Sequence, residues 1–519
     1  MLTKTFLQRI TDAHSWLGFI ISGLLFVVFF CGSIALYRGE IQQWAVQPHL
    51  TLAKGEAKPL SEIMAIAIDG VPFNAKEHLS LILPTEQAPY YEAHVDVEYK
   101  EGEEDELHIL IDPVSGKKVS EGEQFILAEF IYQLHYYLKI PYGVYIVGLV
   151  TLFFFLALVT GVLLHAKKLV SNFFKYRPKQ SKRSRLLDMH TVIGVMTLPF
   201  TLMYAISGLI FNLVIIYQIA FALVLYKGDQ QALLADAGYV ELKPKWQDKA
   251  WQNPAIDQVF AEISSRENHQ PVYVRMYNYG DESAVLQVGG DMTQQIGGQF
   301  DIATELATMQ ETALNDPINT NMVRKGLQVV ANLHFGDYAG YDLRLLYFLL
   351  GLSVCVLIVA GNLLWIDKHF KHREENAKGK IIAEKYTLIS TAGMIFALAV
   401  AFVLERTLAV DMSGRDQVLE YGFGLALLCT TVFVIGCKNA KACLANLLKA
   451  SAIVVLLLVC YDLFNLSGKI KTLALNGHTQ ALWTDIALVL LSALGFYIAG
   501  YLQKKEQEKV VLAQVATTE

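Results

Sequence analysis

LLHAKKLVSNFFKYRPKQSKRSRLLDMHTVIG, residues 163–194, is a basic segment between two long apolar runs, with His165 at one border and His190 at the other. From Lys167 to Arg185 it contains no acidic residue. Loops of membrane proteins that are rich in Lys and Arg lie on the cytoplasmic side. The segment therefore predicts a cytoplasmic hairpin between two membrane-spanning helices.

The composition indicates a polytopic membrane protein rather than a soluble one. The chain has 519 residues, of which 54% are hydrophobic and 18% charged, and its mean hydropathy is +0.36. A helix needs about 20 apolar residues to cross the hydrocarbon layer. About eight runs meet this length, at residues 16–37, 142–165, 192–217, 343–366, 386–404, 419–435, 447–464 and 482–501.

Charge is segregated along the chain. Residues 40–129 are strongly acidic and include EGEEDE at 101–106, whereas the turns after the second, fourth, sixth and eighth runs are basic. The positive-inside rule then predicts a cytoplasmic N-terminus and places residues 40–130 outside. The first run is long and lacks a small-residue cleavage site, so we interpret it as a retained helix and not as a signal peptide.

The first four runs contain an internal repeat. DAHSWLGF at 12–19 matches DMHTVIGV at 188–195, YQLHYYLKIPYG at 132–143 matches ANLHFGDYAGYD at 331–342, and TGVLLH at 160–165 matches AGNLLW at 360–365. Each copy has an even number of spans, so the two copies run parallel across the membrane. The expected domains are a first transmembrane helix (1–40), an external domain (41–130), two helices with the basic hairpin (131–217), a second external domain (218–330), a fourth helix (331–370) and an appended four-helix bundle (385–503).

The external segments have the composition of soluble domains. YYEAHVDVEYK at 90–100 and ELHILIDPVSGKKV at 106–119 predict strands in the first, and PVYVRMYNY at 271–279 and SAVLQVGG at 283–290 predict strands in the second. AIDQVFAEI at 255–263 predicts an amphipathic helix. The expected fold is a mainly α membrane protein with two small α+β domains outside the membrane.

Five histidines lie at the borders of the predicted spans, in register with the repeat: His14, His165 and His190 at the inner border, and His135 and His334 at the outer. Imidazole near lipid is costly and favours a functional role. A snorkelling or carbonyl-bonded side chain is the alternative for any single histidine. His135 and His165 are 30 residues apart, roughly 45 Å along a continuous helix, so they predict two separate sites.

Two imidazoles on facing helices are the axial ligands of a haem in a helical bundle. His135 and His334 are the expected outer pair, and two of His14, His165 and His190 the inner pair. No helix offers the converging ligands of a zinc or copper site, and no Cys-x-x-Cys-His motif exists, so we expect b-type haem, two in number. The remaining histidines of the external segments, His49, His78, His94, His108, His269 and His478, are expected to be surface residues, and the alternative is an external cluster that contacts a metal-bearing substrate.

The chain resembles the PepSY-associated transmembrane family. The similar stretches are LQRITDAHSWLGFIISGLLFVVFFCGSIALYRGEI at 7–41, LHILIDPVSGKKV at 107–119, YQLHYYL at 132–138, TGVLLHAKK at 160–168 and LLDMHTVIGVMTLPFTLMYAISG at 186–208. This family includes iron-regulated inner-membrane proteins and ferrisiderophore reductases of Gram-negative bacteria. The resemblance implies a PepSY-like domain at 41–130, a location in the bacterial inner membrane, and a haem-binding core that carries electrons from the cytoplasmic side to a ferric chelate in the periplasm, with the same five histidines as ligands.

These features predict an oxidoreductase of the ferrisiderophore reductase type, with the lipid bilayer and an Fe(III) chelate as partners and no nucleic acid. The chain has no Gly-rich nucleotide motif, so the electron donor is expected to be a separate cytoplasmic reductase or quinol. The alternative is a non-catalytic membrane module that binds a peptide, a protease or a metal chelate outside. A transporter is less favoured, because the appended helices carry only near-border charges such as Glu405, Arg406 and Asp462.

Overall fold

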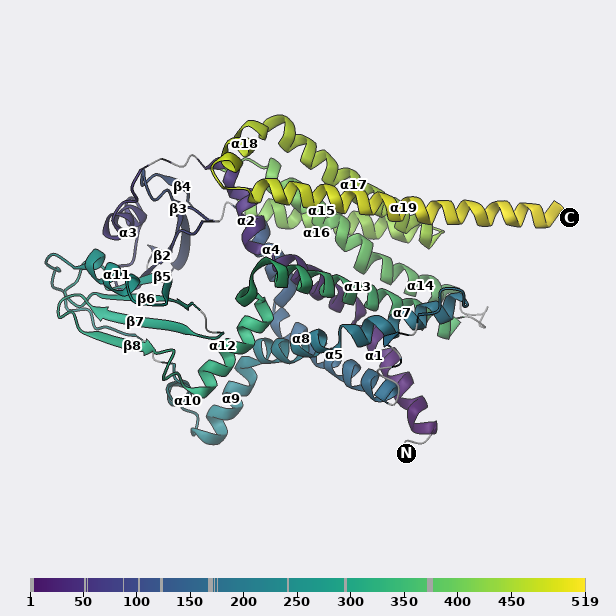
Figure 1. Ribbon diagram of the computed structural model, residues 1–519, viewed down its shortest axis with the longest axis horizontal. Helices are drawn as coiled ribbons and strands as arrows, with labels where there is room; N and C mark the ends of the chain where they lie inside the picture. Colours follow the sequence, from purple (N-terminus) through teal and green to yellow (C-terminus); the bar gives the residue numbers. More distant parts are fainter. Residues whose placement is uncertain are drawn as a thin grey trace. The chain divides into compact units, whose positions relative to one another are not determined.

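The computed structural model describes residues 4–518, except 51–52, 54, 87, 101–102, 122–124, 167–170, 172, 175, 240–241, 294–295 and 371–376. The chain forms two compact units, whose helices and strands are labelled in Figure 1. The helical unit comprises Met1–Ala45, Phe125–Val214 and Ala339–Glu519. The sheet unit comprises Val46–Gln124 and Ile215–Tyr338.

Among the described residues, 7 helices are long and apolar enough to cross a membrane. They are α1 (Lys4–Ala35), α5 (Gly143–His165), α13 (Gly340–Phe370), α14 with η5 and α15 (Ala377–Leu388, Ile389–Gly393 and Met394–Thr407), α16 (Arg415–Gly436), α17 (Ala440–Asn465) and α19 (Gln480–Thr518). The prediction of a multi-pass helical membrane protein is therefore confirmed.

The third predicted span is not one straight helix. α7 (Lys182–Met196) and α8 (Leu198–Asn212) meet at a bend of 65°. Pro199 lies in the first turn of α8, where it has no N–H to donate to the preceding turn and its ring disfavours a continuous helix. The predicted run 192–217 therefore crosses this break, and its last residues belong to α9 (Val214–Leu225).

α1 lies at the centre of the first half of the helical unit. It packs against α5, α13 and the short helix α4 (Leu127–Tyr136). The shared apolar core contains Ile21, Leu25, Phe26 and Phe29 of α1 with Val150, Phe154, Phe200, Ala205, Val354 and Ile358 of its neighbours. The later helices form a second group in which α17 packs along α19 and α15 packs on α16 and α17.

The sheet unit is built on one antiparallel sheet of eight strands in the order β4-β3-β2-β1-β5-β6-β7-β8. The first segment supplies β1 (His78–Ile82), β2 (Tyr91–Lys100), β3 (Glu103–Ile111) and β4 (Lys118–Glu121) after α3 (Leu60–Ile68). The second supplies β5 (His269–Tyr277), β6 (Val285–Met292), β7 (Gln299–Glu305) and β8 (Glu311–Asn315) after α11 (Ile256–Ser264). α2 (Arg38–Val46), η1 (Gln47–His49), α10 (Gln230–Asp236), α12 (Met322–Phe335), η3 (Asp337–Ala339) and α18 (Ser467–Leu475) complete the described helices.

The prediction of two separate external domains is wrong, because both segments share this sheet and one core. β1 pairs with β5 in the middle of the sheet, and Leu79, Leu81, Val274 and Met276 of these strands are fully buried. α3 and α11 pack against the same face. In two separate domains β1 and β5 would each expose an unpaired edge, and their pairing removes both edges. Alternation in the sequence predicts the strands but not their partners across segments.

Candidate functional site

His14 of α1 lies against α5. Its Nδ1 is 3.0 Å from the carbonyl oxygen of Ala157 and 3.1 Å from the Thr160 hydroxyl oxygen. A β-carbon at Gly161 would lie 3.4 Å from His14 Cε1, so the ring packs directly against the backbone at this glycine. We call this arrangement a histidine seat: a backbone carbonyl that faces Nδ1 and a glycine four residues further along the same helix.

His190 of α7 occupies an equivalent seat on α13. Its Nδ1 is 3.1 Å from the carbonyl oxygen of Leu357, and a β-carbon at Gly361 would lie 3.2 Å from its Cε1. A larger residue at Gly361 would therefore force the ring away from α13. Under the predicted repeat, His190 corresponds to His14 and Gly361 to Gly161.

His135 of α4 occupies a third seat, on α1. Its Nδ1 is 2.8 Å from the carbonyl oxygen of Val28, and a β-carbon at Gly32 would lie 2.5 Å from the same nitrogen. Val28 follows His14 by 14 residues on α1, which is about 21 Å at 1.5 Å per residue. The His14 seat and the His135 seat therefore lie at different depths of the helical unit.

The seats determine which nitrogen of each ring can bind a metal. A carbonyl oxygen only accepts hydrogen bonds, so Nδ1 must carry the hydrogen in each of the three rings. Nε2 then carries the lone pair, which is the form in which imidazole coordinates a metal ion. A second-shell bond of this kind also fixes the orientation of a ligating ring.

The structure brings His14 and His190 together. Their ring centroids are 6.3 Å apart and their planes are nearly perpendicular, at 81°. A metal–imidazole bond is about 2 Å long and each nitrogen lies about 1 Å from its ring centre, so two imidazoles on opposite sides of one ion would have centroids about 6 Å apart. The observed separation matches this value.

His165 and His334 differ from the three seated histidines. His165 ends α5 and lies close enough to interact electrostatically with both His14 and His190. His334 lies on α12 of the sheet unit, and its ring packs on Phe335 at a centroid distance of 5.5 Å. His135 belongs to the helical unit, so its pairing with His334 stays a prediction.

The C-terminal helices hold a buried charge network that the sequence only partly indicated. Arg406 Nε lies 3.0 Å from Asp462 Oδ2, and each side chain is 1% exposed. Asp485 accepts a 2.8 Å hydrogen bond from Trp44 Nε1, and the Arg406 guanidinium lies 3.8 Å from the Trp44 ring centroid. The network extends beyond the near-border charges that we noted, because it includes Asp485 and a tryptophan of α2.

The comparison with known families identifies the family of this chain. The model of the PepSY-associated TM region matches residues 11–368. The chain belongs to the PepSY-associated transmembrane family. The resemblance deduced from the motifs is thus confirmed, and the matched region includes all five border histidines but ends before α14. No curated protein was found to be similar to the chain.

Proposed function

We propose that this PepSY-associated membrane protein is a di-haem b electron-transfer protein that reduces Fe(III) chelates. The observation that carries the proposal is the pair of histidine seats at His14 and His190, with ring centroids 6.3 Å apart. His14 and His190 would hold one of the two haems, and His135 would contribute a ligand to the other. Haem, when bound, supplies reversible one-electron chemistry at its iron.

A cofactor that brings four of its own iron ligands suits this site better than a bare metal ion. Zinc and copper sites use three or four converging protein ligands. Of the described residues, the groups of three or more candidate ligands include none of the five border histidines. Two facing imidazoles are enough for a six-coordinate haem iron.

The chain's own residues set the conditions for this cofactor. The carbonyls of Ala157, Leu357 and Val28 accept the Nδ1–H bonds that hold the rings in one tautomer and increase the basicity of Nε2. The glycines of the seats permit the close approach of the rings. The aromatic and aliphatic core around α1 would keep water away from a haem bound there, and this would affect the reduction potential of that haem.

The proposed reaction moves one electron from a cytoplasmic reductase or from quinol to Fe(III) outside. Hard oxygen donors such as those of siderophores bind Fe(II) less tightly than Fe(III), so this electron releases the iron for uptake. We infer a location in the bacterial inner membrane with a cytoplasmic N-terminus. The basic hairpin after α5 supports this orientation.

A cavity on the polar face of the sheet supports an anionic chelate as the substrate. It has a volume of 590 Å³, which suits a small ligand. Its lining contains four cationic side chains, Lys76, Lys243, Arg275 and Arg324, but only two carboxylates, Glu77 and Asp301. Asp301 already pairs with Arg324 at 3.0 Å. Burial, together with the nearby Asp301 carboxylate, raises the pKa of the Tyr273 hydroxyl, so this lining residue stays neutral.

The direct test of the proposed function is the visible spectrum of the full chain purified in detergent from haem-replete cells. We expect a red protein that shows the sharp α-band of six-coordinate b haem after reduction with dithionite, and reoxidation of that band when an Fe(III) chelate is added. A colourless protein would overturn the proposal and favour the non-catalytic binding module.

The cavity gives a second prediction. Arg275 Nε is buried without a hydrogen-bond partner among the described residues, and its guanidinium lies 5.0 Å from the Tyr273 ring centroid. We expect Arg275→Ala to weaken the binding of an anionic ferric chelate about 10- to 100-fold, because a hydrogen bond to a charged group contributes roughly 1.5–3 kcal/mol. Equilibrium titration with a ferric catecholate measures this change.

Arg266→Ala is the matched control for this cavity variant. Arg266 pairs with Glu311 and Glu262 on the same sheet unit but does not line the cavity. The control should bind the chelate like the wild type, and both variants should keep the wild-type haem spectrum. Equal affinities for Arg275→Ala and the wild type would exclude this cavity as the docking site without affecting the haem proposal.

A further inference from the structure

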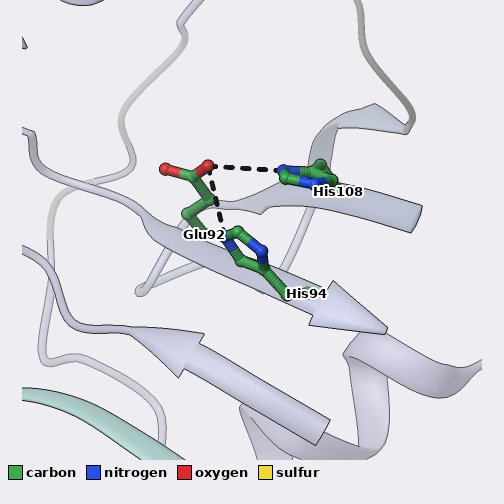
Figure 2. Close-up of side chains that lie close together, drawn as sticks. All are labelled: Glu92, His94 and His108. Atoms are coloured by element: carbon green, nitrogen blue, oxygen red, sulfur yellow. Dashed lines mark ion pairs between the residues drawn. The ribbon is translucent and has the colours of Figure 1, made fainter. Parts of the chain in front are cut away.

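Two histidines and a glutamate meet on the polar face of the sheet (Figure 2). His94 of β2 and His108 of β3 stand directly opposite each other in the strand register, with ring centroids 4.1 Å apart. Glu92 precedes His94 by two residues, so its side chain lies on the same face of the strand. The sequence predicts His94 and His108 to be surface residues, and the pairing of β2 with β3 brings their side chains together.

The three side chains present their donor atoms at the spacing of a metal site. Glu92 Oε1 lies 3.4 Å from His94 Nε2 and 3.6 Å from His108 Nδ1. All candidate ligand atoms of the group lie within 4.8 Å of one another. Ligands about 2.0–2.2 Å from a tetrahedral ion are separated by about 3.4 Å. Two of the three separations therefore already agree with tetrahedral coordination.

Glu106 of β3 lies beside the two rings, near the nitrogen of each ring that does not face Glu92. Its carboxylate lies 3.1 Å from His94 Nδ1 and 3.7 Å from His108 Nε2. Each imidazole thus has one nitrogen toward Glu92 and the other toward Glu106. When a carboxylate accepts a hydrogen bond from one ring nitrogen of a histidine, the other nitrogen keeps its lone pair and can direct it toward a metal ion. Carboxylates commonly orient metal-binding histidines in this way.

An ordinary cluster of ion pairs explains this arrangement less well. Donation by both nitrogens of both rings to the two carboxylates would require two positively charged rings at a centroid distance of 4.1 Å, and like charges at this separation repel each other. A single divalent ion between Glu92 and the two neutral rings uses all three donors. The side chains of Glu92, His94 and His108 are 32%, 22% and 31% exposed, so an ion can reach them from solvent.

We propose that Glu92, His94 and His108 form a binding site for a divalent first-row transition metal ion, with Glu106 as the positioning residue. Two imidazole nitrogens and one carboxylate suit Zn(II) and its neighbours, whereas Ca(II) and Mg(II) prefer sites made of oxygen ligands. Three protein ligands leave a fourth coordination position for water or for a donor atom of a bound ligand. This site is independent of the border histidines and of their proposed haem.

The test titrates the full chain in detergent with Zn(II) alone, against a chromophoric chelator that reports free zinc. We expect His94→Ala and His108→Ala each to lose one bound Zn(II) relative to the wild type. Glu106→Gln keeps all three ligands, and we expect it to retain the ion with about 10- to 100-fold lower affinity. Excess Ca(II) or Mg(II) should not displace the zinc.

His269→Ala is the matched control, because His269 lies on β5 of the same sheet and its Nδ1 is 3.0 Å from the Glu267 carbonyl oxygen. It should bind as much Zn(II) as the wild type. Glu77, His78 and Asp96 form a second group of candidate ligands, so the readout is the zinc lost by each variant and not the total bound. Equal zinc binding by the wild type, His94→Ala and His108→Ala would overturn the proposal. Gel filtration of each variant, together with the zinc bound by Glu106→Gln, separates a specific loss of zinc from misfolding.

Discussion

We expect His190→Ala to lose one of the two proposed haems and to retain the other. His190 faces His14 at a centroid separation of 6.3 Å, whereas the His135 seat is on the Val28–Gly32 part of α1. Removing one of the two imidazoles would leave a haem at the first site with a single protein ligand, and it would leave the residues of the second site unchanged. His14→Ala should have the same effect, because the two rings would bind the same iron.

The measurement is the haem-to-protein ratio, combined with the dithionite-reduced spectrum of each variant. The ratio should fall by about half in His14→Ala and His190→Ala. Gly361→Leu should reproduce the loss while keeping every histidine, because a β-carbon at this position would already lie 3.2 Å from His190 Cε1. Loss of haem in this variant would show that the seat, and not the imidazole alone, makes the site.

Two further variants distinguish the proposed pair from its neighbours. His165→Ala should keep both haems, although His165 lies close to His14 and His190. His369→Ala should also keep both, because the His369 ring packs against the Trp365 and Trp16 rings, at centroid distances of 4.3 Å and 5.2 Å. If His165→Ala lost a haem and His14→Ala did not, the pairing of His14 with His190 would be wrong.

The sequence predicted the positions of the border histidines better than their partners. Matching of the two predicted copies aligned His14 with His190 and Gly161 with Gly361, because a duplicated unit keeps residue types at corresponding positions. Repeat matching left three candidate histidines for the inner pair, namely His14, His165 and His190. The choice among them depends on how the rings face each other across α1, α5, α7 and α13, and spacing along the chain carries no information about that contact.

In the sheet unit, too, the sequence predicts the elements better than the contacts between them. Period-two alternation predicted strands at 90–100 and 271–279, and these correspond to β2 and β5. The pairing of β1 with β5 joins strands almost 200 residues apart, so no local pattern indicates it. No local sequence pattern indicates the contact between His94 and His108 either, because this contact depends on the register of β2 against β3.

The buried charges of the C-terminal helices give the second large expected effect. We predict that Arg406→Leu lowers the stability of the helical unit by about 3–5 kcal/mol, because it leaves Asp462 without its cation inside the protein. Asp462 and Arg406 are each 1% exposed along their side chains. The substitution also removes the guanidinium from the Trp44 ring, which is fully buried. Thermal unfolding in detergent, followed by the loss of the monodisperse gel-filtration peak, measures the change.

The double variant Arg406→Leu/Asp462→Leu should recover part of this loss, because replacing both partners of a buried ion pair by apolar residues leaves no unpaired charge. Lys441→Leu is the matched control, since Lys441 and Glu506 form a 3.4 Å ion pair with side chains 42% and 32% exposed. Such an exposed pair contributes roughly 0–1 kcal/mol. An Arg406→Leu protein that melts like the Lys441→Leu protein would contradict a structural role for the network. Arg406 of α15 also contacts Trp44 of α2, and its neighbour Glu405 accepts a 3.1 Å hydrogen bond from the Leu127 backbone N–H of α4, so we expect the loss of stability to extend from the C-terminal helices to α2 and α4.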